Sequence, residues 1–405
     1  MVADLRPRIR SHVQRAHDPR DRRHGYLVDN LRQCPEPFKV PVPEFGWLQW
    51  FDGQTSLRDI QMAAMRQQGG QLMPLERFAD LARRLDEALL LDGSRWTKHL
   101  DHPDREPTCI GCYDGDPVLL RRQVEDLFTR PTGPGLPRER QPDGGLRAAL
   151  VPHMDYARGG VCYSWGFKEV FERTSASLFV IIGTSHYSSE RFTLTRKNFK
   201  TPLGVVQTDQ DYINRLVRHY GDGLFDDQWL AHLPEHSIEL EVVLLQWYYN
   251  QRRPIRIVPL VVGSFQDATL TGHAPEALDD IGRMIEALRR TEEEIKEPIC
   301  YLISGDLAHL GPKFRSGRPP VDTMELKHST RQDQALLSRL EDVDLDGYFG
   351  IVNQEKDARA ICGFPPTYTL LRALRPRRGK ILNYGRYVHP AGYESVSYAS
   401  AAFYR

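Results

Sequence analysis

The chain has 405 residues, and its 54 lysines and arginines balance its 54 aspartates and glutamates, so the formal charge at neutral pH is zero. A balanced chain gives no electrostatic reason to bind nucleic acid, and no stretch approaches the roughly 20 apolar residues that a membrane helix needs. Six cysteines are too few for a disulfide scaffold at this length, so we expect a cytoplasmic protein with no membrane partner.

The first 25 residues are rich in arginine and have no apolar core, which argues against a signal peptide. We expect residues 1–25 to form a basic, partly ordered arm, and a partner-binding tail is the alternative.

Residues 26–100 are expected to form a small helical domain. An aromatic-apolar helix, a DG turn at 52–53, a helix capped by Thr55 or Ser56, and a helix from near Pro74 follow one another. This order resembles the PqqD-like, winged-helix peptide-recognition domains, which implies a peptide or protein partner. A generic accessory domain of three helices is the alternative. Acidic residues offset the arginines of the two helices, so we do not expect DNA binding.

Cys109 and Cys112 form one CxxC pair in PTCIGCYDGDP. A zinc site would need a second pair of ligands nearby, and none stands at the required spacing. A thioredoxin-type pair would open a helix directly after a strand, whereas the next helix is expected over 117–130. We favour a structural or incidental role, with redox or metal chemistry as the alternative.

Strands and helices alternate from residue 146 onward, after a Pro- and Gly-rich loop at 131–145. The expected strands cover 147–152, 178–183, 256–262, 299–304, 379–384 and 395–403. The expected helices cover 160–173, 209–219, 237–250, 276–290, 325–340 and 360–374. The pattern predicts an α/β domain over 106–405, with a mainly parallel mixed sheet flanked by helices.

Residues with metal-binding side chains follow the expected strands. His153 in RAALVPHMDY, His186 in LFVIIGTSHY and His309 in CYLISGDLAHLG each come just after an apolar run. Cys362 in ARAICGFPP stands at an expected helix start, and Asp306 arrives on the same turn as His309. Because open α/β sheets build their sites at the carboxyl ends of strands, we expect these side chains to share one crevice. Imidazole, thiolate and carboxylate are the parts of a transition-metal site.

Nine sequence blocks, read in order, resemble the Memo family, known in bacteria as AmmeMemoRadiSam system protein B. The blocks are CYDGDPVLLRRQVEDLF, VPHMDY, GTSHYSSERF, TPLGVVQTD, EHSIELEVVLLQ, IVPLVVG, SGDLAHLG, ICGFPP and SVSYASAAF. The likeness runs from about 106 to 405. The family shares its fold with the class III (LigB-type) extradiol dioxygenases, which are non-haem iron enzymes.

The resemblance implies a metal pocket. Its metal ligands would be His153, His186 and Cys362, and the cysteine stands where extradiol enzymes place a glutamate. Asp306 and His309 match the family's "SD-x-x-H" block, and we expect them to be catalytic, with His309 as a base held by Asp306.

Further polar residues are expected around the pocket without binding the metal. The "EHSIE" block contributes three of them, and two departures from the family pattern, VPHMDY for "VPHAGY" and TSHY for "PSHH", change the pocket rim. The five side chains are Asp155, Tyr187, Glu235, His236 and Glu239. Ser237 is expected to cap the helix that follows.

Two imidazoles and a thiolate with open positions suit iron, copper or zinc better than magnesium or calcium. Beside the resemblance to non-haem iron enzymes, we expect iron or copper rather than zinc. We therefore expect a mononuclear redox or oxygenase-type site that acts on a peptide or small molecule. The alternatives are a non-catalytic peptide- or protein-binding module with an adapted dioxygenase pocket, and a zinc-dependent hydrolase. The family's bacterial name implies a modification pathway with a radical S-adenosylmethionine protein and an AMMECR-type protein as partners. This chain has no CxxxCxxC motif, so radical chemistry would belong to a partner.

Overall fold

The computed structural model describes residues 2–139 and 145–405, so residues 140–144 of the expected loop lie outside the described residues. The chain forms two compact units, Met1–Pro103 and Asp104–Arg405. Within the described residues, every helix is too short or too polar to cross a membrane.

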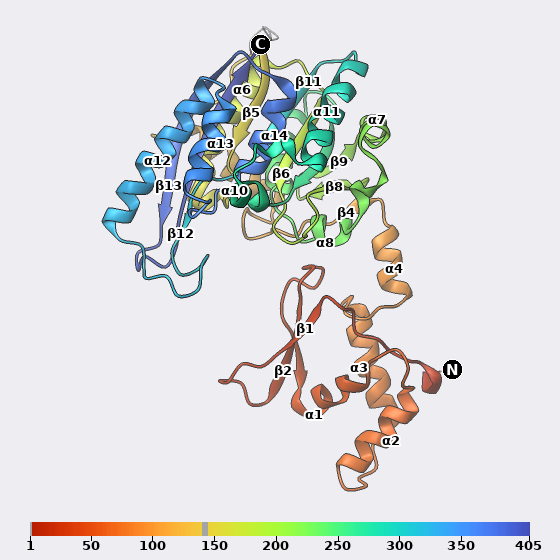
Figure 1. The fold of residues 1–405 in the computed structure, drawn as a ribbon. Helices are drawn as coiled ribbons and strands as arrows, with labels where there is room; N and C mark the ends of the chain where they lie inside the picture. The colour runs from red at the N-terminus through yellow and green to blue at the C-terminus, as the bar shows by residue number, and fades with distance from the viewer. Residues whose placement is uncertain (1, 140–144) are drawn as a thin grey trace. The chain divides into compact units, whose positions relative to one another are not determined.

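The first unit combines a small sheet with helices. Its antiparallel sheet has the order β1 (Val13–Ala16), β2 (His24–Asp29), β3 (Phe38–Pro41). Its helices are α1 (Val42–Phe45), a 3-10 turn (Gly46–Trp50), α2 (Leu57–Gln67), α3 (Leu75–Glu87) and α4 (Ser94–Asp101) (Figure 1). Trp47 stacks on Phe78 with ring centroids 4.1 Å apart in the core. Ser56 caps α2 by accepting a hydrogen bond from the Asp59 amide at 3.2 Å.

The described part of the expected N-terminal arm is structured in this unit. It contributes β1, whose first residue Val13 pairs with Asp29 at the end of β2, and the first two residues of β2, His24 and Gly25. The Arg10 side chain is only 3% exposed and pairs with Asp29 at 2.8 Å. The Arg10 guanidinium also lies 3.9 Å from the ring centroid of Trp96. An arginine buried against a carboxylate and an aromatic face holds the segment in place, which composition alone does not reveal.

A large mixed sheet forms the centre of the second unit. The strand order is β12-β14-β5-β11-β6-β10-β9-β8-β4, with β13 on β14 and β7 on β10. The inner strands β5, β11, β6 and β10 run parallel, and β12, β13 and β14 add antiparallel pairs at one side. The strands are β4 (Asp104–Arg105), β5 (Leu146–Val151), β6 (Leu178–Thr184), β7 (Phe192–Leu194), β8 (Asn198–Thr201), β9 (Gly204–Thr208), β10 (Arg256–Val262), β11 (Ile299–Ser304), β12 (His309–Leu310), β13 (Arg378–Val388) and β14 (Ser395–Tyr404).

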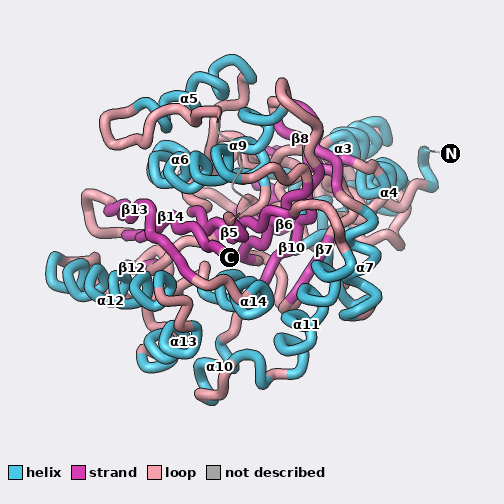
Figure 2. The backbone as a smooth tube through the Cα atoms, turned by 90° about the horizontal axis from the view of Figure 1, so that it is seen from above, coloured by secondary structure: helices cyan, strands magenta, loops and turns pink. Residues whose placement is uncertain are grey.

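Helices cover both faces of this sheet (Figure 2). One face carries α5 (Pro117–Thr129), α6 (Tyr156–Arg173) and α9 (Glu239–Tyr249). The other carries α7 (Gln210–Tyr220), α10 (Gln266–Thr271), α11 (Asp279–Glu294), α12 (Thr323–Glu341), α13 (Leu345–Gln354) and α14 (Phe364–Leu374), and the short α8 (Gln228–His232) precedes α9. Alternate side chains of β6 enter the two cores: Val180 and Ile182 on one face, Phe179 and Ile181 on the other. The expected α/β class, a mixed sheet flanked by helices, is confirmed.

Candidate metal centre

Three histidine rings meet where the inner strands end. His153 follows β5, His186 follows β6, which β11 separates from β5 in the sheet, and His236 stands just before α9. The ring centroids lie 5.0 Å apart for His153–His186, 5.3 Å for His153–His236 and 4.9 Å for His186–His236. One ring nitrogen from each lies within 4.8 Å of the other two, so the three could hold one metal ion. His236 therefore joins the potential donors, whereas the sequence placed it only around them.

Cys362 places a sulfur atom beside one ring of this group, without being one of the three donors that lie within 4.8 Å of one another. Its Sγ lies 3.2 Å from His153 Nε2. The backbone brings it there through a close approach of two loops: Gly363 N–H donates to the Asp306 carbonyl at 2.8 Å. A Cβ on Gly305 would lie 2.4 Å from the Gly363 Cα, so only glycine allows this contact.

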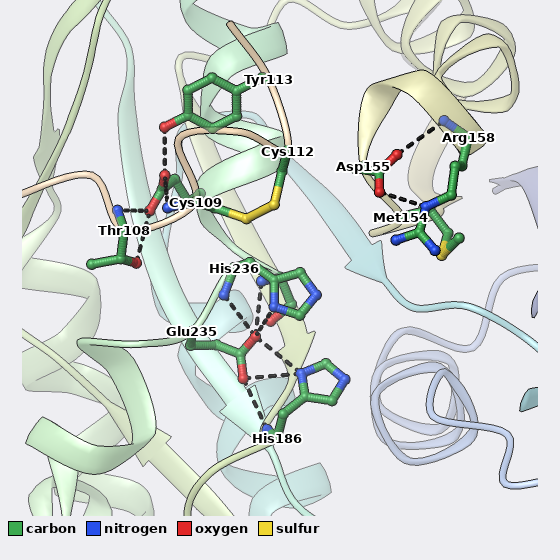
Figure 3. Close-up of a disulfide and its surroundings, with 12 residues drawn as sticks. Thr108, Cys109, Cys112, Tyr113, Met154, Asp155, Arg158, His186, Glu235 and His236 are labelled. Atoms are coloured by element: carbon green, nitrogen blue, oxygen red, sulfur yellow. Dashed lines mark hydrogen bonds and ion pairs between the residues drawn. A yellow bond between two sulfur atoms is a disulfide. The ribbon is translucent and has the colours of Figure 1, made fainter. Parts of the chain in front are cut away.

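Glu235 orients two of the rings from beneath. Its carboxylate is 1% exposed and accepts hydrogen bonds from the His186 amide at 2.8 Å and the His236 amide at 2.8 Å. The Nδ1 atoms of the two rings lie 3.1 and 3.3 Å from the same carboxylate (Figure 3). Holding Nδ1 in this way leaves Nε2 of each ring to bind a metal. Burial opposes both charged forms, yet the contact with His186 holds the pKa of Glu235 well below its usual range and raises the pKa of His186.

Asp306 lies against His153. Its Oδ1 accepts from the His153 amide at 3.1 Å, and its Oδ2 is 3.7 Å from His153 Nε2. Burial raises the pKa of Asp306 to about 7. Burial, together with the His186 and His236 rings, also holds the pKa of His153 well below its usual range, so the ring is neutral, the form that binds a metal.

Two backbone carbonyls fix the ring of His309. The sequence spacing had suggested the Asp306 carboxylate as the partner of this ring. Its Nδ1 lies 3.0 Å from the carbonyl oxygens of both Leu307 and Ala360. Because carbonyl oxygens only accept, Nδ1 carries the proton and Nε2 is the nitrogen that can take up another. Burial lowers the pKa of His309 to about 4, so the ring is neutral at pH 7.

Asp155 and Tyr187 lie beside these groups. Asp155 caps α6 by accepting from the Arg158 amide at 3.0 Å, and its other oxygen pairs with the Arg158 side chain at 2.5 Å. Tyr187 stands edge-on to His186, with ring centroids 6.4 Å apart. The Asp155 carboxylate is thus partly used in capping and ion pairing.

One expectation about the "EHSIE" block needs correction. The Ser237 hydroxyl donates to the Thr184 carbonyl at 2.8 Å and does not cap α9, which begins without a side-chain cap. The Glu239 carboxylate pairs with Arg105 at 2.6 Å and accepts from the Cys109 amide at 3.0 Å. Arg105 was not among the predicted residues, because no sequence spacing marks a buried arginine so far from its partners in the chain.

The comparisons with known proteins agree with this architecture. Residues 105–402 match the family model described as Memo-like protein. A MEMO1 family protein of Methanopyrus kandleri is 28% identical over 311 residues, which cover 75% of this chain and 99% of that protein. A MEMO1 family protein of Aquifex aeolicus is 25% identical over 396 residues, 94% of this chain and 96% of that protein, so the alignment also reaches into the first unit. The family model covers most of the chain and the whole histidine pocket, and the chain therefore belongs to the Memo-like family.

Proposed function

We propose that the second unit binds one transition-metal ion and uses it for redox or oxygenase-type chemistry on a peptide or small molecule. The observation that carries the proposal is the meeting of three imidazoles, with a thiol beside one of them, at the carboxyl end of the parallel strands. Nitrogen donors and a soft sulfur donor suit iron or copper, and they suit magnesium or calcium poorly.

His153, His186 and Cys362 would hold the ion, and His236, whose ring nitrogen lies within 4.8 Å of those of His153 and His186, is a further potential donor. A bound iron or copper ion supplies electron transfer and polarises a coordinated oxygen. Glu235 fixes the ring planes of His186 and His236 through Nδ1. The protein's part is thus to present donors in a fixed geometry while open positions remain for a substrate.

His309 is the proposed proton acceptor. The carbonyls of Leu307 and Ala360 fix its ring, and its lowered pKa keeps it neutral at pH 7. A neutral imidazole in a fixed tautomer can take a proton from a substrate hydroxyl or amide at Nε2. Asp306 serves beside it as the group that fixes the His153 backbone.

For the first unit we propose a peptide or protein partner, as the PqqD-like resemblance implies. Its sheet has two edge strands, β1 and β3, and among the described residues each pairs with β2 alone, so an extended peptide can add to such an edge. A cavity of about 730 Å³ also lies between residues 2–8, α3 and residues 91–94. We further propose that the protein works in an AmmeMemoRadiSam-type modification pathway, with a radical S-adenosylmethionine protein and an AMMECR-type protein as partners.

A zinc-dependent hydrolase is the second candidate, because three imidazoles are a known catalytic zinc set. One measurement separates the two. The full chain is purified without oxygen, its metal content is determined, and its absorption spectrum is recorded. About one iron or copper per chain with a thiolate charge-transfer band supports the redox proposal. Bound zinc with hydrolytic turnover supports the alternative.

The matched variants are His153→Ala in the pocket and His328→Ala on the exposed surface of α12. The first should lose the metal, and the second should keep it. A folded chain that takes up no iron, copper or zinc would refute the metal proposal and favour the non-catalytic binding module.

A further inference from the structure

Cys109 and Cys112 form a disulfide, whereas the other described cysteines are free thiols. The bond joins residues only three apart, and the Cys112 amide also donates to the Cys109 carbonyl at 2.8 Å. Because the stability gained from a cross-link grows with the length of the loop it closes, so short a ring adds little. Holding distant parts of the chain together therefore does not explain this disulfide.

Arg105, four residues before the disulfide, binds the "EHSIE" loop through its side chain. The Arg105 side chain is fully buried and donates to the Glu235 carbonyl at 2.5 Å and to the His232 carbonyl at 2.7 Å. Its Nη1 pairs with Glu239 at 2.6 Å. The Arg105 guanidinium thus binds residues on both sides of His236, in the loop that carries Glu235 and His236 to the pocket.

The turn formed by residues 109–113 binds Glu239, at the C-terminal end of that loop, and also the start of α6. The Cys109 amide and the Tyr113 hydroxyl, both shown in Figure 3, donate to the Glu239 carboxylate. The Cys112 carbonyl accepts from the Tyr156 amide at 2.9 Å, at the first residue of α6. Both cysteines therefore bond, through their backbone, to the first residue of a helix that directly follows a pocket histidine loop.

We propose that Cys109–Cys112 is an exchangeable redox site that takes a dithiol as its reductant, and that its oxidised form keeps the Glu235–Glu239 loop set for metal binding. The second half of this proposal rests on the proposed function. Cys109 is 3% exposed and Cys112 is half-buried, so the attacking thiolate reaches Cys112 first.

The reaction is a thiol–disulfide exchange in two steps. A thiolate of the dithiol attacks the Cys112 sulfur, the bond between Cys112 and Cys109 breaks, and Cys109 leaves as a thiolate that takes up a proton. The second thiolate of the reductant then attacks the mixed disulfide, releases Cys112 and closes the reductant's own disulfide. Two electrons and two protons pass from the dithiol to the pair. Without the covalent closure, the turn keeps the hydrogen bond from the Cys112 amide to the Cys109 carbonyl, and the separation between the Cys109 amide and the Cys112 carbonyl is less tightly fixed.

The first test measures the exchange itself on the full chain under native conditions. The folded protein is equilibrated with mixtures of reduced and oxidised dithiothreitol, the thiols are trapped with iodoacetamide, and the cysteine peptides are quantified by mass spectrometry. We expect a reversible two-electron transition, with Cys112 alkylated about tenfold faster than Cys109, because thiolate access controls the rate. Protection of the buried Cys162 and Cys300 from alkylation shows that the chain stays folded. A pair that is reduced only in denaturant overturns the proposal.

The second test measures the coupling to the pocket. Metal affinity is compared by chelator competition for the oxidised chain, the reduced chain and the double variant Cys109→Ser, Cys112→Ser. We expect about tenfold weaker binding in the last two, the scale on which groups that orient metal ligands act. Equal affinities overturn the coupling.

A metal-free readout keeps the two proposals distinguishable. In the metal-free chain, the alkylation rate of Cys362 should change severalfold between the two states of the pair, because Cys362 lies in the pocket beside His153. An unchanged rate overturns the coupling even if the chain binds no metal, and absence of metal binding in both states refutes the proposed function alone. Cys34→Ser, in the other unit, is the control. It should leave the alkylation rate of Cys362 unchanged in both states of the pair.

Discussion

Replacing Glu235 by glutamine should weaken both the fold and the metal site. The carboxylate accepts from the amides of His186, His236 and Ser237 at 2.8, 2.8 and 3.0 Å, and it also contacts both rings. A glutamine whose oxygen keeps the His236 and Ser237 amides must turn its own NH₂ toward the His186 amide. The variant then loses a charge-assisted hydrogen bond, worth about 1.5–3 kcal/mol, and leaves a buried donor unpaired, which costs about 1–3 kcal/mol. We expect a loss of about 3 kcal/mol in the free energy of unfolding.

The same change frees the His186 ring from the carboxylate that sets its tautomer. Metal affinity should therefore fall about 10- to 100-fold. Urea unfolding of the metal-free chain measures the first effect, and chelator competition near pH 7.5 measures the second. Glu297→Gln is the matched control, because the ion pair of Glu297 with Arg256 is exposed to solvent. Wild-type unfolding and wild-type metal affinity in the Glu235 variant would refute the reasoning.

Three further outcomes are expected. His309→Ala should leave metal content nearly unchanged and cut turnover by about 10²-fold, and loss of the metal would instead make His309 a ligand. Cys362→Ser should weaken metal binding more than His236→Ala does; chelator competition that gives the reverse order would make His236 the third ligand. Burial lowers the pKa of His232 to about 4, so as the pH falls below about 6.5 the unfolded chain takes up a proton before the folded one does. This histidine should therefore cost the fold about 2 kcal/mol at pH 5 and almost nothing at pH 7.5. Urea unfolding of the wild type and His232→Gln at the two pH values checks this, and equal losses in both proteins would contradict it.

The strand ends that lead to the pocket could be read from the sequence. The runs before His153 and His186 are continuously apolar because β5 and β6 are buried on both faces, and such runs end sharply. In the second unit, the short strands β4, β7 to β9 and β12 and the helices α8, α10 and α13 were not predicted. The helix α13 contains Gly347 and Gly350, which lower the intrinsic helix propensity of the segment.

Contacts between distant parts of the chain could not be read in this way. The Asp306 carboxylate accepts a hydrogen bond from the His153 amide, and backbone carbonyls contact the His309 ring, although Asp306 and His309 share a turn. Ser237 has the residue type of a helix cap, yet its hydroxyl bonds to β6. In each case the side chain found its partner on a neighbouring strand end, and sequence spacing carries no information about that choice.

The order in which the donors are synthesised has a consequence for how the metal is acquired. His153 and Cys362, whose side chains lie 3.2 Å apart, are separated by 209 residues. A ribosome that has made β5, β6 and the "EHSIE" loop has exposed three histidines, but the sulfur arrives only after α13. The strand β14, which pairs with β5, is made later still. The proposed donor set is therefore complete only after α13 has been made, and a chain synthesised without metal should still take up the proposed ion once it is folded.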